Sequence, residues 1–333
     1  MQDTHISLAH GNGGRYMREL IEELFVRYLA NDALDVQADA VALDLSSNEL
    51  LFTTDGFTVQ PLEFPGGNIG SLAVHGTCND LSVAGAIPKF LSLNAFIEEG
   101  FEIATLERII KTLAETAKEI DVRVVAGDTK VLRRGEGGGL YLATTGIGVR
   151  NGHVLSMNNI KHGDVIVVSG PVGDHGIAVM MAREEFGLQA DIYSDAASVL
   201  NLTRAAHQFP GLRFMRDPTR GGLATVCTEI QRATEMGVHL YQSKLPVRDA
   251  VQSVCDMLGY DPMYLACEGR VVAVVDQADA DELLKQWRQL EEGEEAAIIG
   301  FVDINRPYVV METEIGGERI IEELEDDPLP RIC

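Results

Sequence analysis

Residues 103–126 read IATLERIIKTLAETAKEIDVRVVA, and two hydrophobic patterns follow one another within this stretch. Between 103 and 120 the apolar residues recur at helical spacing and predict the buried face of an amphipathic helix: Leu106, Ile109, Ile110, Leu113 and Ala117. Residues 122–126 follow as a short apolar run that is typical of a strand. Because a helix with one apolar face must bury that face, the pair predicts helices packed on a sheet.

Similar patterns on both sides of this stretch predict a chain of alternating helices and strands. We expect further helices at 14–29, 68–84, 174–186, 195–208, 220–235 and 279–290. We expect further strands at 41–45, 50–54, 90–97, 140–149, 165–169, 270–275, 296–302 and 307–312, with the first two forming a hairpin.

The alternation of predicted helices and strands begins again near residues 151–159. This predicts two layered domains of the α/β (α+β) class. We expect an N-terminal domain over 1–150, with a mixed sheet and covering helices. An α/β sandwich follows over 151–317, and a flexible tail occupies 318–333.

Composition excludes several classes of protein. The 333 residues carry a formal net charge of −24, whereas nucleic-acid binding needs a positive surface. No apolar run reaches membrane-spanning length, and the first residues lack the pattern of a secretory signal, so we expect a cytoplasmic protein without a membrane partner. The five cysteines lie far apart and form no Cys-x-x-Cys, which favours reduced thiols. Cys78, Cys227, Cys255 and Cys267 lie in apolar segments and are expected in the core, as is Trp287.

The last residues combine acids, two prolines and a cysteine. Residues 322–330 read EELEDDPLP, and proline removes a backbone donor and disfavours helix before it, so an extended, solvated arm is expected. From 318 to 333 such an arm spans roughly 50 Å. Cys333 at its end is either a reactive thiol that visits a distant site or the incidental last residue of a disordered terminus.

Five aspartates stand at predicted strand ends or loop–helix junctions: Asp39, Asp55, Asp80, Asp128 and Asp217. Each one alone is typical of a turn or a helix cap. Together they offer hard oxygen ligands that suit Mg²⁺, and with the glycine-rich loops they favour a nucleoside triphosphate site. Neither a Walker A motif nor a Gly-x-Gly-x-x-Gly loop is present, so a different fold must bind the nucleotide.

Two further charged residues are candidates for catalysis. Lys130, expected on a loop after Asp128, would hold a phosphate or a charged intermediate, and a partly buried Glu268 would act as a general base. The competing interpretation of each is an ordinary surface charge. His10 and His75 lie near the glycine loop and the Asp80 helix, and their roles stay open.

These residues form motifs that resemble the HypE family of [NiFe]-hydrogenase maturation proteins. That family belongs to the superfamily of ATP-binding enzymes with aminoimidazole ribonucleotide synthetase, selenophosphate synthase and thiamine-monophosphate kinase. The resemblance covers essentially the whole chain and rests on the segments 10–14, 53–55, 65–70, 79–81, 127–130, 217–223 and 330–333. The terminal Pro330-Arg331-Ile332-Cys333 is specific to the family, and the glycine loop lacks the cysteine of a selenophosphate synthase.

The resemblance implies an ATP-dependent carbamoyl dehydratase. A HypF-like carbamoyltransferase loads a carbamoyl group onto Cys333, MgATP activates it at the N-terminal domain near a homodimer interface, and a thiocyanate results. The cyanide then passes to iron held by a HypC–HypD complex. Whether the tail enters its own subunit's site or its neighbour's stays open.

The resemblance also implies residue roles. Lys130 lies at the polar end of the reaction site and Glu268 removes a proton. The residues that bind ATP are implied to be Thr54, Asp55, Asn79, Asp80, Gly127, Asp128, Thr129 and Arg220, and the metal ligands Asp39, Asp55, Asp80, Asp128 and Asp217. Asp39 stands alone where relatives more often show paired aspartates.

Two other functions remain open at this point. One is a small-molecule kinase or synthetase of the same superfamily, in which the tail is incidental. The other is a non-catalytic protein that uses its acidic tail to dock a partner or hand over a metal.

Overall fold

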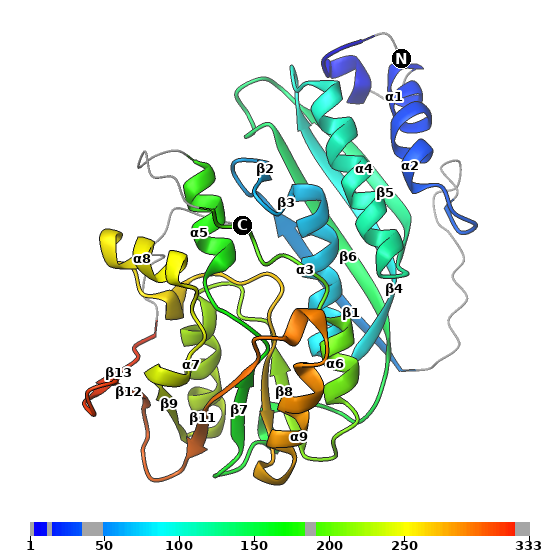
Figure 1. Cartoon of the computed structure of the whole chain (residues 1–333). Coiled ribbons are helices and arrows are strands. Elements are labelled where there is room, and N and C mark those ends of the chain that lie inside the picture. Colours follow the sequence, from blue (N-terminus) through cyan, green and yellow to red (C-terminus); the bar gives the residue numbers. More distant parts are fainter. Residues whose placement is uncertain (1–2, 12–14, 35–48, 184–190, 324–333) are drawn as a thin grey trace.

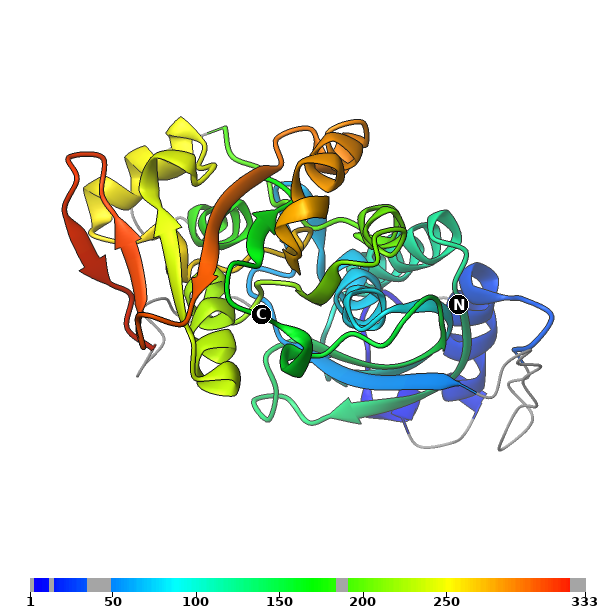
Figure 2. The same ribbon diagram turned by 90° about the horizontal axis from the view of Figure 1, so that it is seen from below.

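The computed structural model describes residues 3–11, 15–34, 49–183 and 191–323. Two sheets, each covered by helices, lie side by side (Figures 1 and 2). The predicted α/β class with an N-terminal mixed sheet and a C-terminal α/β sandwich is therefore confirmed. The division of the chain into domains at residue 150 stays a prediction. Within the described residues, no helix is both long and apolar enough to cross a membrane.

The stretch that predicts the fold is a parallel strand–helix–strand crossover. α4 (Ile103–Glu119) connects β4 (Ala86–Glu98) to the parallel strand β5 (Arg123–Leu132). All five apolar residues predicted on one helix face are buried. Within the described residues, the sheet has the order β1 (Leu50–Phe57), β6 (Leu140–Arg150), β4 and β5.

One face of this sheet, here called the covered face, carries α3 (Ile69–Val83) and α4 side by side (Figure 1). Asn68 caps α3: its Oδ1 accepts hydrogen bonds from the Gly70 and Ser71 N–H groups, at 2.8 and 3.2 Å. Small residues allow α3 to lie close to its neighbours, and Gly76 packs directly on the Phe57 ring. α3 also contacts the C-terminal half, so it lies buried between the two sheets.

Residues 15–29 form a continuous helical segment that packs against α4. Its pieces are α1 (Arg15–Leu20), the π-helical η2 (Ile21–Val26) and α2 (Arg27–Leu29). The short η1 (Leu8–Gly11) contacts α1 and β5. The helix predicted over 14–29 is confirmed over 15–29. A two-stranded ribbon, β2 (Glu63–Phe64) with β3 (Gly67–Asn68), precedes α3.

The C-terminal sheet has seven strands, all antiparallel to their neighbours except the parallel pair β9 and β12. Its spatial order is β13 (Glu318–Ile320), β12 (Val309–Glu312), β9 (Gly237–Tyr241), β11 (Ala297–Asp303), β7 (Val165–Val168), β10 (Val272–Val275) and β8 (Leu212–Arg216). Figure 2 shows β12 and β13 at the end of the molecule opposite α1.

Helices cover both faces of this sheet. One face packs on α7 (Gly222–Thr234), and the other packs on α6 (Leu200–Ala206) and α9 (Gln277–Trp287). Trp287 and the four predicted core cysteines are buried, as expected. The remaining elements are α5 (Asp174–Ala182), α8 (Asp249–Leu258), η3 (Met157–Asn159), η4 (Gln242–Lys244), η5 (Pro262–Tyr264) and η6 (Glu291–Gly293).

The structure corrects several predictions. β5 runs beyond its predicted end, so Asp128 and Lys130 lie within a strand and not on a loop, and Asp55 likewise lies within β1. Glu318–Ile320, which we assigned to the arm, pair with β12 because Ile321 next to them is buried against the sheet. β8, β9, α8 and β13 were not predicted. The predicted strand 41–45 and Cys333 lie outside the described residues.

Candidate active site

Two of the predicted aspartates meet on the covered face of the N-terminal sheet. Residues of β1 alternate between its faces, and Thr53, Asp55 and Phe57 point toward α3. The Thr53 hydroxyl donates a hydrogen bond to Asp80 Oδ2 of α3, at 3.1 Å. Asp55 Oδ1 accepts a hydrogen bond from the Gly56 N–H at 2.8 Å. Strand period and helix packing thus bring together two acids that are 25 residues apart.

The C-terminal half contributes two more acids to the same place. Asp217 follows β8 and Glu268 precedes β10, and both side chains are buried. A small cavity of about 30 Å³ lies where the two halves meet, and its lining residues are Asp55, Gly56, Phe57, Gly76, Asp80, Asp217, Thr219, Arg220 and Glu268. We call it the acidic cavity. Arg220 is exposed at its edge, with one guanidinium nitrogen 3.6 Å from Asp55 Oδ1.

Burial sets the protonation of these acids. It raises the pKa of Asp217 to about 7, with the nearby Asp80 carboxylate adding to the shift. It raises the pKa of Asp80 against the opposing effect of the hydrogen bond from Thr53. Burial also raises the pKa of Glu268 well above its ordinary value, and the neighbouring Asp217 and Asp195 raise it further. Crowded, desolvated carboxylates either retain protons or attract a cation.

The chemistry of these donors fits a hard divalent cation, because carboxylate oxygens are the ligands that Mg²⁺ prefers. Within the described residues, no three His, Cys, Asp or Glu side chains are close enough together to hold a metal ion by themselves. Asp39, the fifth predicted ligand, lies outside the described residues. A bound Mg²⁺ would therefore need further oxygen ligands, such as water or the phosphates of a nucleotide.

A larger pocket of about 530 Å³ adjoins the acidic cavity and shares Asp80 and Asp217 with it. This volume is in the range of small-molecule sites. Apolar side chains and two arginines contribute to its lining, which comprises Leu51, Phe52, Thr53, Asp80, Leu81, Val83, Ala84, Arg150, Leu155, Phe214, Met215, Arg216 and Asp217. An anionic ligand with an apolar part fits this mixture, because the arginines offset negative charge beside the acids.

Asp128 and Lys130 lie on the opposite face of the N-terminal sheet, which α3 and α4 leave open among the described residues and which we call the uncovered face. Asp128 is paired with Asn94 of β4, Asn94 with Ala143 of β6, and Ala143 with Gly56 of β1. These four residues therefore form one row across the sheet. Three strand spacings separate Asp128 from Gly56, roughly 14 Å. Lys130 Nζ is 2.7 Å from Asp128 Oδ2, and its hydrogen bond lowers the pKa of that carboxylate.

The other residues predicted to bind ATP do not line the acidic cavity either. Thr54 lies on the uncovered face, where its hydroxyl donates to the Thr144 carbonyl oxygen at 3.1 Å. Gly127 and Thr129 flank Asp128 in β5, and Thr129 is buried. Within one chain, the acidic cavity therefore brings together five of the predicted site residues: Asp55, Asp80, Asp217, Arg220 and Glu268. The N-terminal sheet separates Thr54, Asp128 and Lys130 from this cavity.

The Asn79 side chain forms its hydrogen bonds with backbone groups of the protein. Its Nδ2 donates to the carbonyl oxygens of Ala197 and Glu268, each at 2.9 Å, and its Oδ1 accepts from the Val199 N–H at 3.0 Å. The side chain therefore joins α3 to two C-terminal segments. A role in binding ATP stays a prediction for Asn79, and its observed contacts are structural.

The sequence alone did not predict a network of ion pairs next to the backbone of Glu268. Asp195 Oδ1 accepts a hydrogen bond from the Glu268 N–H at 3.0 Å, and its Oδ2 lies 3.3 Å from Arg270 Nε. Arg270 also lies near Asp174 and donates to the Pro171 carbonyl oxygen. No local motif signals a contact between residues 195 and 268, which only the tertiary fold brings together.

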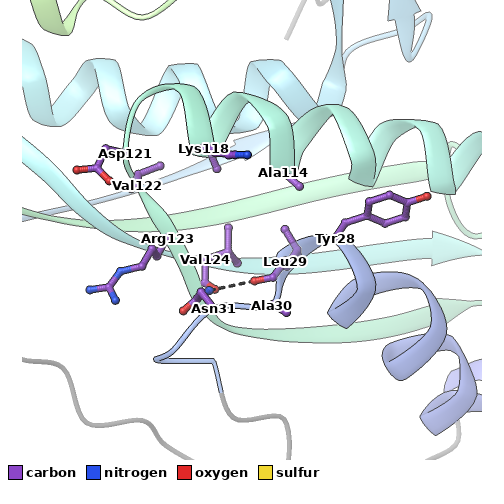
Figure 3. Close-up of a pocket in the computed structure, with 11 residues that line it drawn as sticks. Tyr28, Leu29, Ala30, Asn31, Ala114, Lys118, Asp121, Val122, Arg123 and Val124 are labelled. Atoms are coloured by element: carbon purple, nitrogen blue, oxygen red, sulfur yellow. Dashed lines mark hydrogen bonds between the residues drawn. The ribbon is translucent and has the colours of Figure 1, made fainter.

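A pocket of about 240 Å³ lies elsewhere, between α2, the end of α4 and the start of β5 (Figure 3). Asn31 closes one side, where its Nδ2 donates to the carbonyl oxygens of Leu29 and Val124 at 3.0 and 2.8 Å. Lys118 and Arg123 also line it. None of the predicted site residues contributes to this pocket.

Comparisons with known proteins agree on one family. Residues 37–150 match the AIR synthase related protein N-terminal domain, and residues 161–310 match its C-terminal domain. Carbamoyl dehydratase HypE of Azotobacter vinelandii is 44% identical over 337 residues, which cover 100% of this chain and 98% of that protein.

Two solved structures extend the likeness to three dimensions. The hydrogenase maturation protein HypE in complex with ATP aligns with a TM-score of 0.93 at 39% identity, covering 98% of this chain and 99% of that one. A chain of the HypE–HypF complex aligns with a TM-score of 0.81 at 42% identity, covering 92% and 99%.

Proposed function

The chain belongs to the HypE family of carbamoyl dehydratases, and from this premise we propose that it dehydrates a carbamoyl group carried on Cys333 to a thiocyanate, at the expense of ATP. The thiocyanate supplies the cyanide ligand of [NiFe]-hydrogenase iron. The observation that carries the proposal is the acidic cavity, where Asp55, Asp80, Asp217 and Glu268 meet between the two halves of the chain.

The reaction requires activation, because the oxygen of a carboxamide is a poor leaving group. The carboxamide oxygen attacks the γ-phosphate of ATP and ADP departs. The nitrogen then loses its two protons and the C–O bond breaks, so that phosphate leaves and a C≡N bond remains on sulfur. Glu268 accepts a nitrogen proton in its ionised form, and its raised pKa makes that ionised form a stronger base.

Asp55, Asp80 and Asp217 would hold Mg²⁺ beside the nucleotide, together with Asp39 and Asp128. A bound cation supplies charge compensation for the phosphoryl group. The acidic cavity supports this role, because its desolvated carboxylates repel one another without a compensating charge. Arg220 and the arginines of the adjoining pocket would position the phosphates of ATP.

We also propose that the enzyme is a homodimer whose subunits share each site. Leu50 and Phe52 project from β1 on the uncovered face, and Phe52 is 70% exposed. A second copy that covers this apolar surface would bring its own Asp128, Lys130 and Thr54 to the edge strand β1, beside the acidic cavity of its neighbour. Lys130 would then hold the polar end of the reacting group.

Two partners follow from the chemistry of the thiol. A HypF-like carbamoyltransferase would load Cys333, consistent with the solved complex of a relative with HypF. A HypC–HypD complex would receive the cyanide on its iron. We place these encounters in the cytoplasm, where the thiols of the chain stay reduced.

Intact-mass spectrometry tests the central step. After incubation with the carbamoyltransferase, carbamoyl phosphate and MgATP, the chain should gain a carbamoyl group and then lose one water, and fragmentation should place both changes on Cys333. The variant Cys333→Ala should fold and bind ATP but form no adduct. Thiocyanate formation by Cys333→Ala, or turnover of a diffusible substrate after removal of residues 321–333, would contradict the proposal.

A further inference from the structure

We propose that Asp195 is a positioning residue that holds Glu268 in its reactive orientation through the Glu268 backbone. The inference rests on the proposed role of Glu268 as the base. Within the described residues, no side chain forms a hydrogen bond or ion pair with the Glu268 carboxylate itself. Its direction into the acidic cavity therefore depends on how its backbone is held.

Three hydrogen bonds hold the backbone of residues 267 and 268. The Glu268 N–H donates to Asp195 Oδ1 at 3.0 Å, and the Glu268 carbonyl oxygen accepts from Asn79 Nδ2 at 2.9 Å. The preceding Cys267 N–H donates to the Pro218 carbonyl oxygen at 3.0 Å. Of these three anchors, only Asp195 and Asn79 act through side chains.

The chain around Asp195 lies directly against this segment. A Cβ atom added at Gly269 would come within 1.9 Å of the Asp195 carbonyl oxygen, so only glycine permits such an approach. The Ala197 carbonyl oxygen shares the Asn79 amide with Glu268. Residues 195–197 thus form a rigid support behind the base.

Arg270 fixes the Asp195 carboxylate in turn. The Asp195 side chain is 0% exposed, and its Oδ2 lies 3.3 Å from Arg270 Nε. The same guanidinium lies 3.6 Å from Asp174 Oδ2. A buried carboxylate is costly even when paired, and a hydrophobic residue is often no less stabilising at such a position. Asp195 instead directs an oxygen at one particular N–H group, that of the proposed base.

Asp195→Ala tests the inference in a single-turnover dehydration of the carbamoylated protein. Small displacements of a catalytic group cost on the order of 100-fold in rate, so we expect a loss of roughly 10- to 100-fold. ATP affinity and carbamoyl loading should stay unchanged. Asp195→Asn keeps an oxygen that accepts the Glu268 N–H, so it should recover most of the rate.

Asp174→Ala is the matched control, because it also removes a buried carboxylate from Arg270 but does not touch Glu268. Its dehydration rate should stay within about twofold of the parent rate. Equal losses in Asp195→Ala and Asp174→Ala would overturn the positioning role. If Asp195→Ala does not fold, Asp195→Glu replaces it: this variant keeps the charge but displaces the acceptor oxygen, and it should be slower than Asp195→Asn. The reverse order would overturn the inference.

Experiments with Glu268→Ala distinguish a failure of the positioning role of Asp195 from a failure of the proposed role of Glu268 as the base. In the Glu268→Ala background, Asp195→Ala should cause no further loss, because Asp195 acts through Glu268. An additive loss in the double variant would overturn the inference alone. Full activity of Glu268→Ala would reject the proposed base, and the positioning role with it.

Discussion

The two faces of the N-terminal sheet present carboxylates in opposite environments. On the covered face, Asp55 and Asp80 meet the buried Asp217, whose pKa burial raises to about 7. On the uncovered face, Asp128 is exposed and its pKa is lowered by the hydrogen bond from Lys130. The environments differ because Asp217 is buried between the two halves of the chain, whereas Asp128 is exposed and paired with Lys130.

This difference constrains how one site could use both groups. The sheet itself separates them within one chain, since they lie on different faces and near opposite edges. A reaction that needs Asp80 and Lys130 together therefore requires two copies of the chain.

The largest effect is expected from mixing two inactive variants, Asp80→Asn and Lys130→Ala. If each site combines Asp80 of one subunit with Lys130 of the other, a mixed dimer contains one intact site and one doubly altered site. Random assembly from equal amounts should then restore roughly one quarter of the parent activity. The readout is thiocyanate formation after co-expression, with each variant alone as the control. Activity no greater than that of the separate variants would place both residues in one subunit's site.

A smaller effect concerns the pH dependence of stability without divalent cations. The pKa of Asp217 rises from 3.8 to about 7 on folding, so between these values the folded state retains a proton that the unfolded state has lost. Stability from this group is full below pH 4 and declines until pH 7. Asp217→Asn should abolish this decline and be more stable than the parent at pH 8 by up to about 4 kcal/mol.

Urea denaturation at several pH values, with a chelator present, measures this difference. Asp128→Asn is the control from the uncovered face. The pKa of Asp128 is lowered, so its contribution to stability has the opposite sign: it is present above the ordinary pKa and is lost as the pH falls. A parent protein whose stability does not decline between pH 4 and 7 would refute the environment that we assign to Asp217.

The smallest effect is expected from Asp128→Ala on folding. The Asp128–Lys130 pair is at least half exposed on each side, and such pairs contribute less than about 1 kcal/mol. The free energy of unfolding should therefore change little, and the remaining difference should vanish in high salt. Thermal denaturation at two salt concentrations provides the measurement. A loss of several kcal/mol would show that the pair stabilises the fold, in contrast to its predicted role in the reaction.

Local patterns predicted the elements that bury long, regular apolar faces. α4 lies within one residue of its predicted position, because the helical spacing of its apolar residues is visible over four or five turns. α3, which was predicted from its run of small residues, also lies within one residue of its predicted position. The strands β8, β9 and β13 have five residues or fewer and were missed, since so short a run has no distinctive period. β5 extends past Asp128 because β4 offers a partner along its whole length, which no local signal reveals.

The sequence by itself determined which chemistry is available: dispersed aspartates, Glu268, Lys130 and a cysteine at the end of an acidic segment. It also determined the family, because those residues occur in motifs at fixed positions. Only the tertiary structure decided which acids share a cavity, on which face Lys130 lies and what holds Glu268 in place. The physical reason is that these relations depend on contacts between residues far apart in the chain, which packing establishes and local sequence does not encode.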